Sequence, residues 1–419
     1  MISWIEDVQI FHRDFTAKAN LNILQGEIEM HKKLLPVISI LMIAAFILSA
    51  CGGSSAPAGP QKVTLWHAYQ TGSAEEAALA TLIENAKKAY PEWTIEVLQV
   101  PFDQIFNKYQ TEVAAGGGPD LYVAPNDSLG DQVRAGLVAD ITDLVKGKLD
   151  KITEQGVGGM SVDGKIYGIP ESAKAVALYY NKDFVPTPPK TTDELLAAVQ
   201  GGAKMTLFNG AYHFFGWPGA FGGKLLDDTG KCIADQGGWV EAANYLLTLK
   251  EAGTQVSTDY GAAEAPFRAG ETAFWPNGPW ALGDYKKDLG DKLGVVPIPS
   301  GTAASAPLIG IDGFYINPNS KGKEAAVELG LFLTSKESEQ IYMDQAGHIP
   351  VRTDVTISDP FVQGFVNANS TAFVRPQSTE FSNFWTPFGD MWVKVMEGTL
   401  TPEQAVAEAC AAMNTANGK

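Results

Sequence analysis

The order of strand-like and helix-like patterns between residues 62 and 125 most restricts the fold of this chain. Apolar and polar residues alternate in KVTLWHAY, and TIEVLQV and PDLYVAP are further apolar strand patterns. Between them, SAEEAALATLIENAKKAY and FDQIFNKYQTEVAAGGG carry apolar residues at helical intervals, and Ser73 and Glu76 have the spacing of a capping box. A strand–helix–strand–helix–strand order predicts an α/β unit with a parallel sheet.

The alternation returns later in the chain. KIYGIP, AVALYYNKD and KLGVVPIP read as strands, whereas TTDELLAAVQ and LTPEQAVAEACAAMN begin with capping-box patterns at Thr191 and Thr401. SKGKEAAVELGLFLTSKESEQIYMDQAG predicts two helices separated near Thr334–Ser335. A chain of 419 residues exceeds one small core. Since no linker rich in proline or serine divides residues 62–419, we expect two lobes that share strands or crossovers.

Composition restricts the ligands that such lobes could bind. Hydrophobic residues make up 45% of the chain and charged residues 19%, which is ordinary for a globular protein. The formal net charge is -17, and no stretch is rich in lysine or arginine. Binding of nucleic acid needs a basic surface, and so does adhesion to anionic lipid, so both are disfavoured. A neutral ligand is compatible with this surface.

The stretch MHKKLLPVISILMIAAFILSAC begins with Lys32 and Lys33, continues with an apolar run and ends in small residues. This order is typical of a secretory signal peptide. The apolar run is shorter than the ~20 residues that a membrane-spanning helix needs. A buried helix of a globular domain is the other interpretation, but GGSSAPAGPQ follows directly and predicts a flexible linker.

Leu48-Ser49-Ala50-Cys51-Gly52 resembles the lipobox of bacterial lipoproteins. The resemblance implies cleavage before Cys51 and attachment of a lipid to this residue. We therefore expect an upstream extension over 1–29 that is not part of the product, a signal peptide over 30–50 with its start at Met30, and a tether over 51–61. At ~3.5 Å per residue, the tether would hold the folded protein within roughly 35 Å of the membrane. The predicted location is extracytoplasmic, with the lipid as the one membrane contact.

Cysteine and histidine positions give no metal-site pattern. No two cysteines have the spacing of zinc ligands, and His67, His213 and His348 are scattered. If Cys51 carries lipid, Cys232 and Cys410 either form a disulfide or are two small buried residues. The glycines at 116–118 end a helix and lack the lysine and serine of a phosphate loop. No nucleophile elbow or HExxH motif occurs, so we expect neither a catalytic residue nor a cofactor.

Several longer segments, in order across roughly residues 62–410, resemble the extracytoplasmic carbohydrate-binding proteins of ABC importers, the maltose, maltodextrin and cyclodextrin group. The matching segments are KVTLWHAY, GGGPDLYVAPNDSLGDQVRAGLVADITDLV, DGKIYGIPESAKAVALYYNKDFVPTPPKTTDEL, FRAGETAFWPNGPWALGDY and PLIGIDGFYINPNSKGKEAAVELGLFLTS. The resemblance implies a two-lobed periplasmic-binding-protein fold, each lobe a sheet flanked by helices, joined by a hinge around a sugar.

The same resemblance implies that each lobe takes two separate segments of the chain. We expect residues 62–172 and 313–358 in lobe 1, and residues 173–312 and 359–419 in lobe 2. The hinge crossings are expected near Ala173, near Gly310 and near residues 355–363.

A pyranose offers an apolar C–H face and a rim of hydroxyls, so its site needs flat aromatic rings and planar polar groups. Trp280 lies in NGPWALG at an apparent strand-to-helix turn, Trp385 in a polar loop before a helix, and Tyr212 in NGAYHFFGWPG. The resemblance implies that all three line a sugar cleft, whereas core packing is the alternative. Trp217 and Trp275 are better explained by core packing.

Polar candidates lie in loops after predicted strands. Asn126 and Asp127 follow DLYVAP, where the carboxyl end of a parallel strand is a usual ligand position, although both residue types also favour turns. Tyr69 and Gln70 follow the first strand and are further candidates. Lys174 lies where related maltose binders often carry an acidic sugar-binding residue. Because a lysine only donates hydrogen bonds, it could point away, pair with Glu171 or contact a different sugar.

The predicted function is therefore capture of an extracellular maltodextrin-type oligosaccharide and its delivery to ABC permease subunits. We expect a monomer that closes around its ligand at the hinge and is not an enzyme. Two alternatives stay open: a surface-anchored glycoside hydrolase, which needs two carboxylates facing one sugar bond, and a sugar sensor that docks on a membrane receptor.

Overall fold

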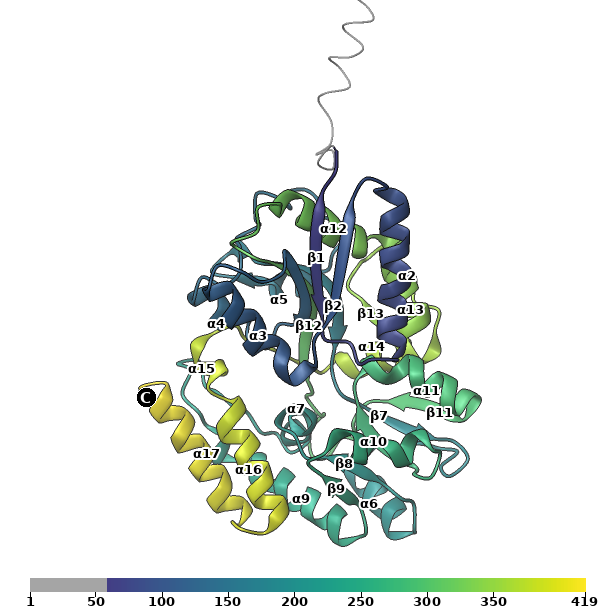
Figure 1. Ribbon diagram of the computed structural model, residues 1–419. Helices are drawn as coiled ribbons and strands as arrows, with labels where there is room; N and C mark the ends of the chain where they lie inside the picture. The colour runs from purple at the N-terminus through teal and green to yellow at the C-terminus, as the bar shows by residue number, and fades with distance from the viewer. Residues whose placement is uncertain (1–58) are drawn as a thin grey trace, which may run out of the picture. The chain divides into compact units, whose positions relative to one another are not determined.

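The computed structural model describes residues 59–419, which belong to one compact unit (Figure 1). The predicted upstream extension, the signal peptide, Cys51 and most of the predicted tether lie outside the described residues. Within residues 59–419, no helix has the length and apolar character needed to cross a membrane.

A seven-stranded sheet organises the first region of this unit. Its strands follow the order β13-β6-β12-β3-β1-β2, and β14 pairs with one end of β12. The parallel pairing of β1 with both β2 and β3 confirms the α/β unit predicted from the alternating pattern. The strand bounds are β1 Lys62–His67, β2 Thr94–Gln99, β3 Leu121–Pro125, β6 Gly168–Lys174, β12 Leu308–Ile316, β13 Ile349–Pro350 and β14 Phe373–Val374.

Helices α2, α12 and α13 pack beside one another in this region (Figure 1). Their bounds are Ala74–Ala89, Lys323–Leu333 and Lys336–Ala346, and α3 covers Phe102–Ala114. The Ser73 side chain accepts from the backbone N–H of Glu76, but the Glu76 carboxylate accepts from Gly72 instead of Ser73, so the predicted capping box is only half formed. Ser335 caps α13 and separates it from α12, as predicted.

The second region is built on a three-stranded antiparallel sheet in the order β10-β7-β11 and a parallel pair, β8 with β9. Helices α9, α16 and α17 pack against one another beside these strands. Thr191 and Thr401 both form the predicted capping boxes. The bounds are β7 Ala177–Asn181, β8 Thr206–Phe208, β9 Gln255–Ser257, β10 Phe274–Asn277, β11 Leu293–Val296, α6 Thr192–Gln200, α9 Trp239–Glu251, α16 Trp385–Glu397 and α17 Pro402–Ala416.

Shorter elements complete both regions. They are α4 Leu129–Arg134, α5 Glu154–Gly159, β4 Ser161–Val162, β5 Lys165–Ile166, α7 Ala211–Phe214, α8 Gly216–Ala220, η1 Ala234–Gln236, α10 Tyr260–Arg268, η2 Pro279–Ala281, α11 Leu282–Leu289, η3 Gly290–Lys292, α14 Pro360–Asn369 and α15 Thr379–Ser382.

A disulfide joins Cys232 to Cys410, with 5.5 Å between the Cα atoms. It ties α17, near the C-terminus, to the segment before η1. Asn414 supports the same junction, because its side-chain oxygen accepts from the Cys232 N–H at 2.7 Å. Of the two interpretations that the sequence left open, the structure shows the disulfide and not two separate buried cysteines.

The chain passes between the two regions three times: from β6 to β7, from β11 to β12, and from β13 to α14, which packs on β11. These connections lie close to the expected hinge crossings. The predicted boundaries at residues 173 and 312 cut through β6 and β12, because both strands continue in the seven-stranded sheet. The division into lobes stays a prediction.

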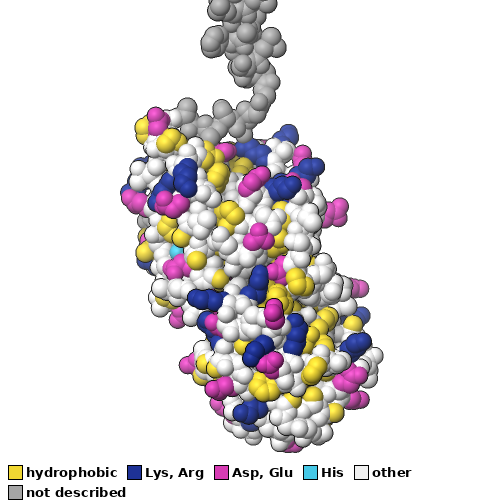
Figure 2. All heavy atoms as spheres, turned by 90° about the vertical axis from the view of Figure 1, so that its right-hand side faces the viewer, with side chains coloured by type: hydrophobic (Ala, Val, Ile, Leu, Met, Phe, Trp, Pro, Cys, Tyr) yellow, Lys and Arg dark blue, Asp and Glu magenta, His cyan; other side chains and the backbone are white. Residues whose placement is uncertain are grey.

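Two hydrophobic clusters fill the unit, and one of them continues from the first region into the second. Leu282 and Tyr285 of α11 share this cluster with Met343 of α13. Trp217 and Trp275 are fully buried, as expected for core residues. On the face shown in Figure 2, acidic and basic side chains are interspersed and hydrophobic side chains occur in small groups.

Candidate functional site

Aromatic and cationic side chains form one row that contains five of the predicted site residues. The guanidinium carbon of Arg375 lies 5.3 Å from the ring centroids of both Trp385 and Tyr212. The Tyr212 and Trp280 rings are 6.0 Å apart. The Lys174 ammonium lies 6.0 Å from the Trp280 ring and 5.9 Å from the Tyr69 ring. The row therefore reads Trp385, Arg375, Tyr212, Trp280, Lys174, Tyr69.

Two of the three predicted aromatic residues lie in short helical elements, and the third begins a longer helix. Trp280 lies in η2, between β10 and α11, which agrees with the predicted strand-to-helix turn, and its indole N–H donates to the Tyr260 hydroxyl at 2.9 Å. Tyr212 lies in α7 and donates its hydroxyl to the Lys174 carbonyl at 3.0 Å. Trp385 is the first residue of α16, so it begins the helix and does not lie in the predicted loop before it.

The loop after β3 meets the row at Arg375. Asp127 forms an ion pair with Arg375, whose side chain is almost completely buried. Asn126 is buried and fully engaged: its amide donates to the Gly159 carbonyl at 2.9 Å, and its oxygen accepts from Ile311 and Arg375, each at 3.1 Å. Asn126 therefore supports the loop, whereas the Asp127 side chain keeps 27% of its surface exposed and faces the site.

Lys174 pairs with two carboxylates, which excludes one of its predicted roles. Its ammonium lies 2.7 Å from Asp312 on β12 and 3.0 Å from Glu75 on α2. Glu171 instead contacts His348 at 2.7 Å, so the predicted Lys174–Glu171 pair was wrong. Burial acts to lower the pKa of Lys174, but Asp312 and Glu75 outweigh it and raise this pKa well above its ordinary value. Lys174 thus stays a charged donor.

Buried charges continue behind Lys174. His348 bridges Glu171 and Glu75, with 2.7 Å from each ring nitrogen to a carboxylate oxygen. Burial alone would lower the pKa of His348, but Glu171 and Glu75 outweigh burial and raise it to about 9. Burial raises the pKa of Asp312 to about 6, although Lys174 acts in the opposite direction. In this cluster, the positive charges of Lys174 and His348 compensate the negative charges of the carboxylates that they contact.

The two residues after the first strand differ in their placement. Tyr69 is only 5% exposed and packs edge-on against Tyr342 and His348 at the end of the row. Its hydroxyl is buried without a hydrogen-bond partner among the described residues. Gln70 is exposed, and its backbone carbonyl accepts from Ser73 at the start of α2. The structure brings Tyr69 to the site and leaves Gln70 as part of a turn.

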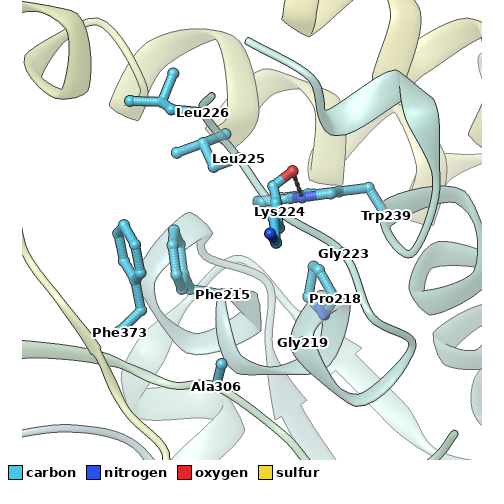
Figure 3. A pocket seen from close by; sticks show the side chains of 10 residues that line it. All are labelled: Phe215, Pro218, Gly219, Gly223, Lys224, Leu225, Leu226, Trp239, Ala306 and Phe373. Atoms are coloured by element: carbon cyan, nitrogen blue, oxygen red, sulfur yellow. Dashed lines mark hydrogen bonds between the residues drawn. The ribbon is translucent and has the colours of Figure 1, made fainter. Parts of the chain in front are cut away.

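A separate cavity of about 270 Å³ lies in the second region, beside α8 and the start of α9 (Figure 3). Figure 3 shows Phe215 and Phe373 side by side, and their rings stack at 5.6 Å. Lys224 is the one charged residue in a lining that otherwise consists of Pro218, Gly219, Gly223, Leu225, Leu226, Trp239 and Ala306. This lining offers little to the hydroxyl rim of a sugar, so the row is the better candidate site.

Arg375, Asp312, Glu75 and His348 were not predicted as site residues. Asp312 had a signal in the sequence, because it is the one charge within the apolar run LIGIDGFYI. Within residues 59–419, no group of three or more histidine, cysteine, aspartate or glutamate side chains is arranged to hold a metal ion. The arrangement offers aromatic faces and ionised hydrogen-bonding groups, which suit binding of a polyhydroxylated ligand.

The chain is similar in sequence to known solute-binding proteins. A sequence model of the bacterial extracellular solute-binding protein family matches residues 81–365. A maltotriose-binding protein of Pyrococcus abyssi is 28% identical over 79% of this chain and 76% of its own length. A maltooligosaccharide ABC transporter solute-binding lipoprotein of Streptococcus pneumoniae is 25% identical over 89% of this chain and 94% of its own length.

A solved structure confirms the fold class. The maltotriose-binding protein of Thermus thermophilus, bound with maltotriose, superposes with a TM-score of 0.78 at 27% identity and covers 85% of this chain and all of that protein. The predicted two-lobed α/β fold, each lobe a sheet flanked by helices, is therefore correct.

Proposed function

The chain belongs to the family of bacterial extracellular solute-binding proteins, and we propose that it binds a maltodextrin-type oligosaccharide and delivers it to the permease of an ABC importer. The relatives support this substrate class, because the Pyrococcus protein is described as binding maltotriose and the Streptococcus protein as serving a maltooligosaccharide transporter. The proposed ligand site is the row from Trp385 to Tyr69 together with Asp127.

This row of aromatic and cationic side chains is the observation that carries the proposal. A pyranose presents apolar C–H faces to aromatic rings, and its hydroxyls accept from cations and donate to carboxylates. Trp385, Tyr212 and Trp280 supply rings, and Asp127 supplies a carboxylate beside them. Because the row collects side chains from the seven-stranded sheet and from the second region, a ligand there contacts both predicted lobes. Closure of the lobes at the hinge would then follow ligand binding.

The proposed role is binding without catalysis. A glycoside hydrolase needs two carboxylates that face one sugar bond, one of them able to give a proton. The carboxylates along the row are held by cations instead: Asp127 by Arg375, and Asp312 and Glu75 by Lys174. We therefore assign no residue of the row to hydrolysis.

A screen for thermal stabilisation tests the substrate class. Maltose, maltotriose, maltohexaose, a cyclodextrin and galactose-based oligosaccharides are each added to the purified protein. A ligand that binds the native state alone raises Tm, and we expect the largest rise from a maltodextrin. No rise with any sugar would contradict the proposal. Release of shorter products from maltohexaose would instead show a hydrolase.

We also propose that the protein acts as a monomer held at the outer side of the membrane by a lipid on Cys51. The lipobox-like pattern supports this location, and the Streptococcus relative is described as a lipoprotein. Mass spectrometry of the mature protein should find a lipid-modified Cys51 at its N-terminus, and Cys51→Ala should abolish the modification. A mature N-terminus upstream of residue 30 would contradict both the cleavage site and the proposed start at Met30.

A further inference from the structure

We propose that Arg375 is a specificity-determining residue of the sugar site, which holds the Asp127 carboxylate in the orientation that reads one hydroxyl of the ligand. This inference rests on the proposed function and names a residue that the sequence analysis did not. Arg375 follows β14, whereas Asp127 follows β3, and 248 positions separate them in the chain.

The guanidinium of Arg375 is confined on several sides. Trp385 and Tyr212 each lie with a ring centroid 5.3 Å from its central carbon. Its backbone N–H donates to the Ile309 carbonyl at 3.1 Å. A Cβ atom at Gly310 would lie 2.8 Å from Nη1, so this glycine leaves the room that the guanidinium occupies. Arg375 therefore has one well-defined placement, although its charge lies at the end of a long side chain.

Because Arg375 is confined, the Asp127 carboxylate that it binds is held in one orientation as well. Nη1 donates to the Asp127 oxygen Oδ1 and, at 3.1 Å, to the Asn126 oxygen. No hydrogen bond from a described residue to the second carboxylate oxygen of Asp127 occurs, and this side chain is 27% exposed. Asp127 thus keeps one oxygen free to accept from a ligand hydroxyl, while Arg375 fixes the direction of that oxygen.

Arg375 also has a polar atom of its own that lacks a partner. Its Nε is buried and makes no hydrogen bond to a described residue. Because Nε is covered by protein atoms and the whole side chain is only 2% exposed, this donor is not offered to a ligand. Arg375 therefore acts on the ligand through the partly exposed Asp127 carboxylate.

Lysine could not reproduce this arrangement. A guanidinium is planar, so it can pack its face on an aromatic ring while its N–H groups point outward in its own plane. An ammonium carries its three donors on one atom and lacks this plane. Arg375→Lys is therefore expected to behave like Arg375→Met, and not like the wild type.

Calorimetry with maltotriose and a set of its monodeoxy derivatives tests the proposal on wild type, Arg375→Met, Arg375→Lys and Asp127→Asn. In the wild type, removal of the hydroxyl that Asp127 reads should weaken binding by about tenfold or more. Each variant should bind maltotriose about tenfold more weakly, and the same deoxy derivative should then bind nearly as well as maltotriose itself. Arg352→Met is the control, since Arg352 pairs with Asp354 and lies outside the row.

Two results would overturn the inference. Equal or tighter maltotriose binding by Arg375→Met would show that the guanidinium merely fills the slot between the rings. Weaker binding with an unchanged pattern across the deoxy derivatives would show a structural role. If Arg375→Met does not fold, as judged by Tm and circular dichroism, Arg375→Lys decides, because it keeps a positive charge beside Asp127 and lacks the guanidinium. Absence of sugar binding by the wild type would instead refute the proposed function.

Discussion

At the scale of single residues, the proposed site depends on how aromatic rings and charges share one space. Aromatic faces attract cations, and both cations of the row lie beside two rings. The same cations hold carboxylates, so neither charge sign is left uncompensated near the rings. Such compensation matters because an unpaired buried charge is strongly destabilising. The charged groups that we propose to orient a ligand thus also stabilise the fold around it.

Trp385→Ala should weaken maltodextrin binding by roughly 1–3 kcal/mol, because the ligand loses an aromatic contact face. Isothermal calorimetry on the folded variant measures this change. Trp93→Ala is a matched control, since Trp93 stacks on Tyr90 at 4.2 Å and lies outside the row. The control should lower Tm and leave affinity unchanged. Unaltered affinity of a natively folded Trp385→Ala protein would remove Trp385 from the site.

His348 should make stability depend on pH above neutrality. Its pKa in the folded protein is about 9, because Glu171 and Glu75 outweigh burial, whereas an unfolded histidine titrates near its ordinary value of 6.5. The folded state therefore binds more protons between these values, and its stabilisation is complete below pH 6.5 and is lost as pH rises through 9. The largest contribution is roughly 3 kcal/mol.

Urea unfolding of wild type and His348→Asn between pH 6 and 10 measures this contribution. The difference in unfolding free energy should shrink as pH rises. His213→Asn is the control, because burial lowers the pKa of His213 to about 4 and this histidine stays neutral throughout the range. A His348→Asn difference that is constant with pH would contradict the assigned charge. The groups that contact His348 are Glu75, Glu171, Tyr69 and Tyr342. Lys174 pairs with Glu75 and with Asp312, so these two groups lie one contact further away.

At the scale of elements, α4 and the segment before α15 make the contact that joins the first region to the C-terminal helices (Figure 1). The Gly130 N–H donates to the Gln377 side chain at 3.2 Å, and Arg134 donates to the Gln377 carbonyl at 3.1 Å. Arg134 also reaches the Ser382 hydroxyl at 3.3 Å. Since α4 and α15 belong to different predicted lobes, this contact is expected to form on closure.

Gly130→Ala should impede that contact. A Cβ atom at this position would lie 2.1 Å from the Gln377 carbonyl oxygen, which belongs to the backbone and cannot rotate away. Overpacking of this kind costs roughly 1–3 kcal/mol, and we expect sugar affinity to fall by a corresponding amount. Gly389→Ala in α16 is the control, because nothing lies within 4 Å of an added Cβ there. Wild-type affinity in Gly130→Ala would show that binding does not require this contact.

At the scale of the whole molecule, three connections join the two regions, and the proposed ligand lies against both. A ligand that contacts two lobes only in their closed arrangement shifts the population toward that arrangement. The continuous cluster that includes Leu282 and Met343 shows that the regions also touch through apolar side chains. Opening would therefore involve the loss of buried area beside α11, in addition to polar contacts near α4.

Small-angle X-ray scattering tests closure. The radius of gyration should fall when a saturating maltodextrin is added to the free protein, because the lobes approach each other. The change should be smaller for Gly130→Ala, and Gly389→Ala should behave like the wild type. An identical radius with and without a tightly bound sugar would refute closure at the hinge.

Local patterns in the sequence were sufficient for the α/β alternation, the capping boxes at Thr191 and Thr401 and the break between α12 and α13, because these features depend on residues a few positions apart. The resemblance of longer segments indicated the family and most residues of the row. The tertiary structure alone decided the Cys232–Cys410 disulfide, the partners of Lys174 and the ion pair of Arg375 with Asp127. Each of these joins segments about 100 to 250 residues apart, and no local spacing determines which distant charges meet when the chain is packed.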